Sequence, residues 1–319
     1  MKAGFIGLGN VGHHLAGSLV ATEGIEVMVR DLDETLAQPL IANGAQWGAS
    51  AQTLAAWADF VITCLPSPAI SAEVMEGKAG VLAGFSENKI WIEMSTTDGD
   101  EIKRLHEKIR ARGGDTLEAP VSGGCHRAET GNIAILAAGS RSAFERGLPL
   151  LKAMGKDILH TGDLGSASIL KVITNYLAFA NLVSVGEALT VASKSGLDLG
   201  LAYEAIRISS GNSFVHETES QVILNGSYDI NFTLDLVLKD LGLFQSIADQ
   251  QLIPLEISPL LQRIFEDGVK QFGPRAWSSM IVKRLEDAAG TTLRAEGFPA
   301  RLKDTSSRTQ GAEIIPGSG

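Results

Sequence analysis

Short apolar runs alternate with amphipathic segments through the first half of the chain. Helical periodicity covers residues 10–22, 51–58 and 100–112, and a further helical pattern ends at residues 43–44. Apolar runs of strand length lie between these segments, at residues 3–6, 25–29, 60–64, 90–94 and 116–119. Strands separated by helices require crossover connections. The pattern therefore predicts an α/β fold with a mostly parallel, doubly wound sheet of the Rossmann type, covered on both faces.

The pattern changes after Gly165. Residues 168–193 carry apolar side chains at helical spacing without a proline, over about twice the length of an average helix. Further helical patterns follow at residues 201–209, 232–250, 258–271 and 277–288, and no convincing strand is predicted beyond His160. The second half is therefore predicted to be an all-α domain, joined to the sheet domain by the long helix.

We expect three segments in the chain. The sheet domain spans residues 1–163, the all-helical domain spans residues 164–290, and a C-terminal arm spans residues 291–319. The arm is polar and contains Pro299 and Pro316. This composition predicts a segment that lies over the surface or against a partner subunit, not a third domain.

Composition and charge narrow the class of protein. Acidic residues outnumber basic ones by 37 to 27, for a net charge of −10, whereas a nucleic-acid surface needs clustered positive charge. Cys64 and Cys125 are too few for a disulfide framework, and Asn10, His13 and His14 interrupt the N-terminal apolar stretch. No window reaches about 18–20 uninterrupted apolar residues. We expect a cytoplasmic protein without a membrane segment.

Residues 7–12 have the glycine pattern GxGxxG, placed between a predicted strand and a predicted helix. Gly7 permits a tight turn, Gly9 lets the backbone approach a pyrophosphate, and Gly12 lets helix and strand pack closely. The helix N-terminus offers unpaired N–H groups and partial positive charge to phosphates. The expected cofactor-binding residues of this loop are Gly7, Leu8, Gly9, Asn10, Val11 and Gly12.

Asp31 lies about 20 residues beyond the glycine loop, at the end of the second predicted strand. Its carboxylate would accept hydrogen bonds from the ribose hydroxyls of NAD and repel the 2′-phosphate of NADP. Arg30 could bind that phosphate instead, although strand alternation points it to the other face. We expect NAD as the cofactor, with NADP not excluded.

Residues 4–16 (GFIGLGNVGHHLA) resemble the opening of the β-hydroxyacid dehydrogenase family, which includes 3-hydroxyisobutyrate dehydrogenase and tartronate semialdehyde reductase, with 6-phosphogluconate dehydrogenase as a larger relative. Further segments match in the family's order, at residues 63–70 (TCLPSPAI), 93–97 (EMSTT), 119–124 (APVSGG), 165–175 (GSASILKVITN) and 232–241 (FTLDLVLKDL). The resemblance implies a Rossmann domain, a helical domain with a long connecting helix, and an NAD-dependent oxidoreductase.

The resemblance also assigns roles to matched positions. A loop along the cofactor and a contact near the nicotinamide ribose correspond to Leu65, Pro66, Ile70 and Thr96. A loop that holds the substrate carboxylate with a hydroxyl and backbone N–H groups corresponds to Ser122, Gly123 and Gly124. Taken alone, both segments are also compatible with ordinary turns.

Lys171 is the expected catalytic residue by the same resemblance. Carbonyl reduction needs a proton for the oxygen and alcohol oxidation needs that proton removed; a lysine with a pKa lowered toward neutrality does both. Asn175, one helical turn later, would hold the substrate. Lys239 resembles a lysine that reaches the cofactor, with Asp240 to orient it. Without the family context, Lys171 would be a snorkelling lysine and Lys239 an exposed one.

The chain departs from the family after the SGG loop, where Cys125, His126 and Arg127 replace small residues. Our hypothesis is that Arg127 recognises a second acidic or polar group of the substrate; a solvated or subunit-facing arginine is the alternative. Cys125 has no base motif beside it and is expected to be a packed thiol. His13 and His14 lack the spacing of a metal pair, so no metal site is expected.

Two other functions stay open from sequence alone. An imine reductase of the same fold generally lacks the lysine, and a non-catalytic dinucleotide-binding assembly protein typically lacks it too and carries extra recognition modules. The expected function is hydride transfer between NAD and the β-carbon of a small 3-hydroxy acid, with Lys171 as general acid and base, in a homodimer or homotetramer.

Overall fold

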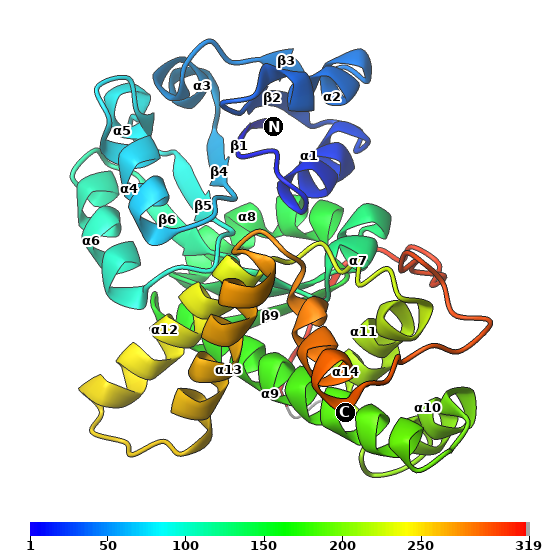
Figure 1. The fold of residues 1–319 in the computed structure, drawn as a ribbon. Helices are drawn as coiled ribbons and strands as arrows, with labels where there is room; N and C mark the ends of the chain where they lie inside the picture. The colour runs from blue at the N-terminus through cyan, green and yellow to red at the C-terminus, as the bar shows by residue number, and fades with distance from the viewer. Residues whose placement is uncertain (317–319) are drawn as a thin grey trace. The chain divides into compact units, whose positions relative to one another are not determined.

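The computed structural model describes residues 1–316, and the chain divides into two compact units (Figure 1). The first unit contains Met1–Lys171 together with the C-terminal segment from Asp304, and the second contains Val172–Lys303. The division falls within the long helix α9 (Ser166–Lys194), a few residues beyond the predicted boundary at residues 163–164. The predicted C-terminal arm is shared between the units.

A mostly parallel sheet forms the centre of the first unit. Its strand order is β10-β9-β8-β6-β5-β4-β1-β2-β3, with β7 paired to β8 beside this row. Only the pairs of β8 with β6 and with β7 are antiparallel among the described strands. The strands are β1 (Lys2–Ile6), β2 (Glu26–Arg30), β3 (Gln46–Trp47), β4 (Phe60–Thr63), β5 (Ile90–Glu93), β6 (Asp115–Glu118), β7 (Val121–Ser122), β8 (Ala134–Ala138), β9 (Asp157–Gly162) and β10 (Ala312–Glu313). The predicted doubly wound sheet is confirmed.

Helices cover both faces of this sheet because its central strands are apolar on both sides. Ile62 and Ile92 pack on one face with α1 and α8, while Val61 and Trp91 pack on the other with α3, α4, α5 and α6. The helical segments of this unit that precede α9 are α1 (Gly12–Val20), η1 (Glu34–Ala37), α2 (Gln38–Ala42), α3 (Ala51–Trp57), α4 (Pro68–Glu76), α5 (Val81–Gly84), α6 (Gly99–Arg110), α7 (Cys125–Thr130) and α8 (Arg141–Met154).

The second unit consists of helices around an apolar core of its own, in which Phe179, Leu234 and Phe265 are buried. Side chains begin several of these helices. Ser213 accepts a hydrogen bond from the His216 N–H at 3.0 Å, for example, and so caps α11. Its helical segments after α9 are α10 (Leu199–Arg207), α11 (Phe214–Asn225), α12 (Leu234–Gln250), α13 (Ile257–Phe272), η2 (Ser278–Val282) and α14 (Lys283–Ala289). The predicted helical domain is confirmed.

The prediction that no strand follows His160 is wrong. Strand β9 runs to Gly162, and β10 adds a short parallel strand from the C-terminal segment to its edge. The Ala312 N–H donates to the Lys156 carbonyl at 2.8 Å and the Ile314 N–H to the Ile158 carbonyl at 2.7 Å. A two-residue strand has no alternation of its own, so pairing with an existing edge determines it.

Helix α9 is, among the described residues, the one helix long and apolar enough to cross a membrane by length and composition. It has 29 residues, with a mean hydropathy of 1.4 in its most apolar window. A core helix of a water-soluble protein passes the same test, so the helix alone is weak support for a membrane span. The sequence criterion of an uninterrupted apolar run is stricter, because polar residues such as Asn175 and Glu187 interrupt the helix.

Candidate active site

The carboxyl ends of the central parallel strands meet at one edge of the sheet. The register places Ile6 beside Arg30 and Thr63, then Thr63 beside Glu93, and Glu93 beside Glu118. The loops after these residues therefore emerge together, and they contain Gly7, Asp31, Leu65, Thr96 and Ser122. In open α/β sheets, ligands bind outside this edge where the strand order reverses, which here is at β1, between β4 and β2.

The three glycines of the GxGxxG loop have different structural reasons. Gly7 has φ of +98°, and a Cβ there would overlap the Cys64 carbonyl oxygen. A Cβ on Gly12 would overlap the Gly7 carbonyl oxygen, so both glycines are required by the fold itself. At Gly9, by contrast, no described residue lies within 4 Å of the Cβ position. The space beside Gly9 therefore fits the close approach of a dinucleotide pyrophosphate.

The rest of the loop joins strand β2 to helix α1. Leu8 is buried, and its N–H donates to Oδ2 of Asp31 at 2.6 Å. Asn10 is exposed and Val11 half-buried, immediately before α1. The first turn of α1 contains no acidic residue, so the positive end of the helix dipole is not neutralised from within the helix.

Arg30 and Asp31 point to different neighbours. The Arg30 guanidinium donates to the carbonyls of Gly48 and Ala49, at 2.9 Å each, and lies 5.6 Å from the ring centre of Trp47. Asp31 faces the glycine loop instead. The alternation that predicted opposite directions for these two side chains agrees with their contacts.

A buried glutamate connects the loops after β4 and β5. The Leu65 N–H donates to Oγ of Ser95 at 2.7 Å, and the Ser95 hydroxyl and N–H both donate to Oε1 of Glu93. Burial raises the pKa of Glu93, and the hydrogen bonds from Ser95 partly oppose that rise. Thr96 follows directly, so Glu93 positions two of the predicted cofactor-contacting segments. Sequence reasoning missed Glu93 and Ser95, although an acidic residue closing an apolar strand was visible.

Pro66 and Ile70 lie at the start of α4. Pro66 is exposed, and Ser67 caps the helix by accepting a hydrogen bond from the Ile70 N–H at 3.3 Å. Ile70 is 36% exposed. An exposed apolar side chain in the first turn of this helix is available to cover part of a bound cofactor.

The SGG segment leads from β7 directly into α7. Gly123 and Gly124 have φ of +123° and +84°, a conformation that side-chain-bearing residues rarely adopt. A Cβ on Gly123 would lie 3.1 Å from Cδ of Arg127, so the arginine side chain lies over this glycine. Cys125 is buried. The two glycines thus turn the backbone beside Ser122 and give it the conformation of an anion-binding loop.

Lys171 is 7% exposed, in a part of α9 that a carboxyl group fixes to the sheet. Glu118, the last residue of β6, accepts hydrogen bonds from the Ser168 N–H and hydroxyl at 2.8 Å each, and from the Gly165 N–H. Burial raises the pKa of Glu118, and these hydrogen bonds oppose the rise. Glu118 thereby caps α9 one turn before Lys171. Sequence reasoning missed Glu118, whose only signal was its position just before the APVSGG segment.

Asp240 connects two of the predicted residues in the helical unit. The Asn175 side-chain amide donates to Oδ2 of Asp240 at 2.6 Å, and Nζ of Lys239 lies 2.9 Å from Oδ1. Asp240 is 1% exposed, whereas the Lys239 side chain is 19% exposed. A buried carboxylate therefore orients both the amide on α9 and the lysine on α12.

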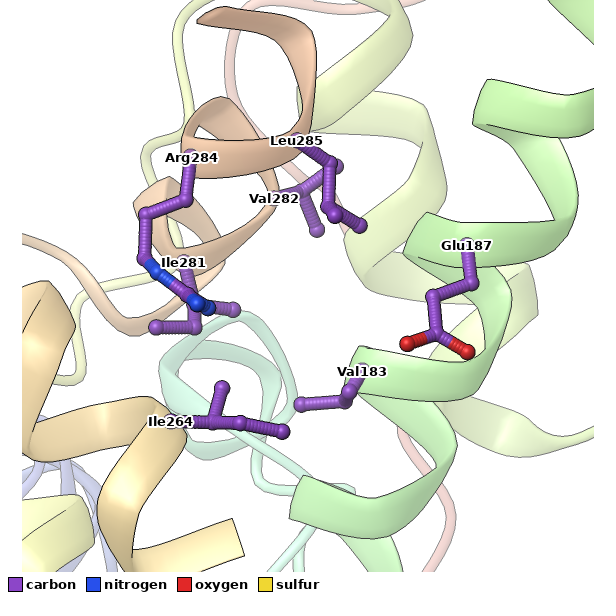
Figure 2. Close-up of a pocket in the computed structure, with 7 residues that line it drawn as sticks. All are labelled: Val183, Glu187, Ile264, Ile281, Val282, Arg284 and Leu285. Atoms are coloured by element: carbon purple, nitrogen blue, oxygen red, sulfur yellow. The ribbon is translucent and has the colours of Figure 1, made fainter. Parts of the chain in front are cut away.

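Other features of the structure are less suited to this chemistry. Figure 2 shows a small pocket of the helical unit, lined mostly by apolar side chains, with Glu187 and Arg284 at its border. Its lining residue Val183 follows Lys171 by about three turns of α9, so the pocket is separate from the predicted catalytic position. Within residues 1–316, no group of three or more His, Cys, Asp or Glu side chains could hold a metal ion.

The fold and the sheet edge together define a dinucleotide-binding α/β protein. Residues 2–162 match the family model described as the NAD binding domain of 6-phosphogluconate dehydrogenase. Residues 165–285 match the model described as NAD-binding of NADP-dependent 3-hydroxyisobutyrate dehydrogenase.

Individual relatives agree with these family models. The chain is 34% identical over 294 residues to 2-(hydroxymethyl)glutarate dehydrogenase of Eubacterium barkeri, which covers 92% of this chain and 97% of that protein. It is 32% identical over 271 residues to the mitochondrial 3-hydroxyisobutyrate dehydrogenase of Drosophila melanogaster, covering 82% of each. A solved 3-hydroxyisobutyrate dehydrogenase structure from Salmonella typhimurium aligns with a TM-score of 0.82 and 26% identity, covering 89% of this chain and 99% of that one.

The chain therefore belongs to the 3-hydroxyisobutyrate dehydrogenase family of NAD(P)-dependent hydroxyacid dehydrogenases. It is an oxidoreductase that binds a nicotinamide dinucleotide and acts on a small hydroxy acid. The resemblance to β-hydroxyacid dehydrogenases is confirmed.

Proposed function

We propose that the enzyme interconverts a small 3-hydroxy acid and its carbonyl form, with NAD as the preferred cofactor and Lys171 as the catalytic acid and base. The supporting observation is the connection made by Glu118. This residue ends the strand that leads into the SGG loop, and it caps the helix that carries Lys171. One buried carboxyl group thus links the predicted acid-binding loop to the predicted proton-transfer residue.

Proton transfer is the task of Lys171 in this proposal. The bound nicotinamide accepts a hydride from the alcohol carbon or returns it to the carbonyl carbon. In oxidation the neutral amine takes the proton from the substrate hydroxyl; in reduction the ammonium group gives a proton to the carbonyl oxygen. Exclusion of water around a buried amine keeps that proton directed to the substrate.

Substrate orientation is the task of the SGG loop and Asn175. The Ser122 hydroxyl and the N–H groups of Gly123 and Gly124 would hold the carboxylate, because positive φ angles turn successive N–H groups into an anion-binding nest. The Asn175 amide, fixed by Asp240, would hold the hydroxyl or carbonyl group. Lys239, fixed by the same carboxylate, would contact the cofactor.

A preference for NAD over NADP is supported by the residues after β2. Asp31 is followed by Leu32, which is 99% exposed, and then by Asp33 and Glu34. The one basic residue beside them, Arg30, already donates to two backbone carbonyls. A 2′-phosphate would meet carboxylates at this position, which disfavours its binding.

We further propose that the substrate has a second acidic group. The relative from Eubacterium barkeri acts on 2-(hydroxymethyl)glutarate, whose name denotes two carboxylates. In this chain Arg127 lies over Gly123 of the SGG loop, where a guanidinium can pair with such a group. In a panel of hydroxy acids, Arg127→Ala should raise KM for dicarboxylic substrates on the order of tenfold and leave monocarboxylic ones unchanged. Equal KM values across the panel would contradict this specificity.

Oligomer formation and location are also proposed. Large apolar side chains are exposed on α9, α10 and the residue after α10, namely Leu177, Val191, Leu201 and Ile208. Exposed apolar side chains concentrated on neighbouring segments are typical of subunit interfaces, so we propose a homodimer or homotetramer. We propose a cytoplasmic enzyme because the sequence contains only two cysteines.

Reduced-nicotinamide absorbance with a panel of 3-hydroxy acids tests the proposed reaction. The wild-type chain should turn over at least one acid with NAD, and Lys171→Met should lower kcat on the order of 10²–10⁴-fold without abolishing NAD binding. Lys152→Met, a lysine of α8, is the control. Cofactor binding without turnover of any acid would instead favour the non-catalytic alternative, and full activity of Lys171→Met would overturn the assignment of the base.

A further inference from the structure

The C-terminal segment returns to the sheet unit and makes specific polar contacts there. Arg308 donates to the Ala153 carbonyl at 2.7 Å, and Glu313 forms a two-point ion pair with Arg141 at 2.6 and 3.0 Å. Gly311 approaches the backbone so closely that a Cβ would overlap the Gly155 carbonyl oxygen. The segment, here called the C-terminal arm (residues 304–316), is therefore anchored at several points and not merely draped over the surface.

The first anchor of the arm is Asp304. Its Oδ2 accepts hydrogen bonds from the Thr130 hydroxyl at 2.5 Å and the Asn132 side-chain amide at 2.7 Å. Asn132 is 3% exposed and also donates to the Ser306 carbonyl at 3.2 Å. Partial burial opposes it, but the hydrogen bonds from Thr130, Asn132 and Ser306 hold the pKa of Asp304 well below its ordinary value. The contact is therefore made by a carboxylate.

Thr130 and Asn132 border the turn between α7 and β8. The Arg127 carbonyl accepts hydrogen bonds from the Thr130 hydroxyl at 3.2 Å and from the Asn132 N–H at 2.8 Å. Asp304 therefore holds the same two residues that close the end of α7. Among the groups that act on the pKa of His126, burial lowers it most, Arg127 lowers it further, and Asp304 counters both. The carboxylate is thus close enough to influence the first turn of α7.

Helix α7 is short, so fixing one end fixes the other. It spans Cys125–Thr130 and begins directly after Gly124. On the other side of the SGG loop, β7 pairs with β8, Val121 with Ile135 and Ser122 with Ala134. The loop is therefore held from one side by β8 and from the other by α7, and Asp304 secures the turn that connects these two supports.

We propose that the C-terminal arm is a functional part of the substrate site, with Asp304 as a positioning residue for the loop Ser122–Gly124. This inference rests on the proposed role of that loop in holding the substrate carboxylate. Neither family model extends to the arm, since the second one ends at residue 285. The arm thus adds to the family's site a support from a segment far along the chain.

The test compares steady-state kinetics of Asp304 variants with wild type. Asp304→Ala removes both acceptors and should raise KM for the acid on the order of tenfold, because small displacements of a binding loop are costly, while KM for NAD stays unchanged. Asp304→Asn keeps one acceptor oxygen and should have a smaller effect in the same direction; it also serves if the alanine variant does not fold. The matched control is Glu313→Gln, which weakens the far anchor of the arm and should leave both KM values unchanged.

A Ser122→Ala variant separates the two levels of the inference. If Ser122→Ala raises KM for the acid and the Asp304 variants do not, the role of the arm is overturned and the function of the loop stands. If Ser122→Ala also leaves KM unchanged, the proposed function of the loop fails, and with it the inference. A rise of both KM values together, with a lower melting temperature, would mean general destabilisation and would equally overturn a positioning role.

Discussion

Three glutamates have largely buried carboxyl groups, and they differ in what their oxygen atoms accept. Glu93 and Glu118 accept hydrogen bonds from hydroxyl and N–H groups at the site. At Glu219 in α11, Oε2 is shielded from water and no described residue donates to it. Burial raises the pKa of Glu219 to about 8. Two buried acids thus organise the site, whereas the third is neutral at physiological pH and weakens the fold as it ionises.

Glu219 should make stability depend on pH. The unfolded carboxyl ionises near 4.5 and the folded one near 8, so the folded state retains a proton through that interval. The free energy of unfolding therefore falls as pH rises from about 4.5 to about 8. Glu219→Gln should remove this slope and raise stability on the order of 1–3 kcal/mol at the upper end. Thermal melts across the interval measure it. Glu296→Gln, at an exposed position of the same unit, is the control; identical slopes for wild type and Glu219→Gln would contradict the prediction.

Asp31 should determine cofactor choice. Its carboxylate accepts from the Leu8 N–H and would face the ribose hydroxyls, so Asp31→Ala removes both interactions. We expect KM for NAD to rise on the order of tenfold, and the ratio of kcat/KM for NAD to that for NADP to fall at least as much. Asp33→Asn, which keeps a helix-capping side chain at η1, is the matched control. An unchanged ratio in Asp31→Ala would mean that another residue reads the ribose.

At the scale of elements, α9 depends on its N-terminal cap. The capping group is Glu118, from a different element, so the start of the helix is fixed relative to the sheet. Other helices are capped by a residue next to them in sequence, as Ser140 caps α8 by accepting from the Ala143 N–H at 3.0 Å. The direction in which α9 leaves the sheet, and with it the placement of Lys171, is therefore decided by a tertiary contact.

Glu118→Gln should lower kcat more than it lowers stability. The amide keeps one acceptor oxygen but places an NH₂ group against N–H donors of the helix, which displaces the first turn before Lys171. We expect kcat to fall on the order of tenfold with little change in KM for NAD. Ser140→Ala removes a comparable cap on α8, and it should cost on the order of 1 kcal/mol without a change in kcat. If both variants affect kcat equally, the cap of α9 has no special role in positioning Lys171.

Prediction from sequence succeeded for elements with strong periodicity and failed for those formed by pairing. The strands at residues 3–6 and 90–94 and the long helix at residues 168–193 correspond to β1, β5 and α9 within a few residues. By contrast, β7 and β10 have two residues each and went unpredicted, as did α7 between them in sequence. A short segment carries too little periodicity to indicate a strand, and its conformation is set by the edge that it joins.

At the scale of the whole molecule, assembly should depend on the exposed apolar side chains of the helical unit. Leu201 is 72% exposed and Ile208 77% exposed. The double substitution Leu201→Glu and Ile208→Glu should reduce the mass measured by size-exclusion chromatography with light scattering, because buried like charges disfavour association. Leu32→Glu, at a 99% exposed position of the sheet unit, should leave the mass unchanged. An unchanged mass in the double variant would exclude this surface as the interface.

The amino-acid sequence by itself determined the class of fold, the family and the glycine loop. These follow from local periodicity and from residues adjacent in the chain: alternating strands and helices, GxGxxG before a helix, and Asp31 after the second strand. Such features survive in a single sequence because the physical requirement is local. A tight turn needs glycine at Gly7, and a helix end that binds phosphate needs exposed N–H groups.

Only the tertiary structure decided which side chains support the site. Glu118 meets Gly165 across 47 residues, and Asp304 meets Thr130 across 174. No periodicity relates such partners, because register, strand order and the return path of the chain bring them together after the elements have formed. Burial completes the distinction: a glutamate is the same letter in the sequence at Glu93 and Glu296, and only packing makes one a buried organiser of two loops and leaves the other in water.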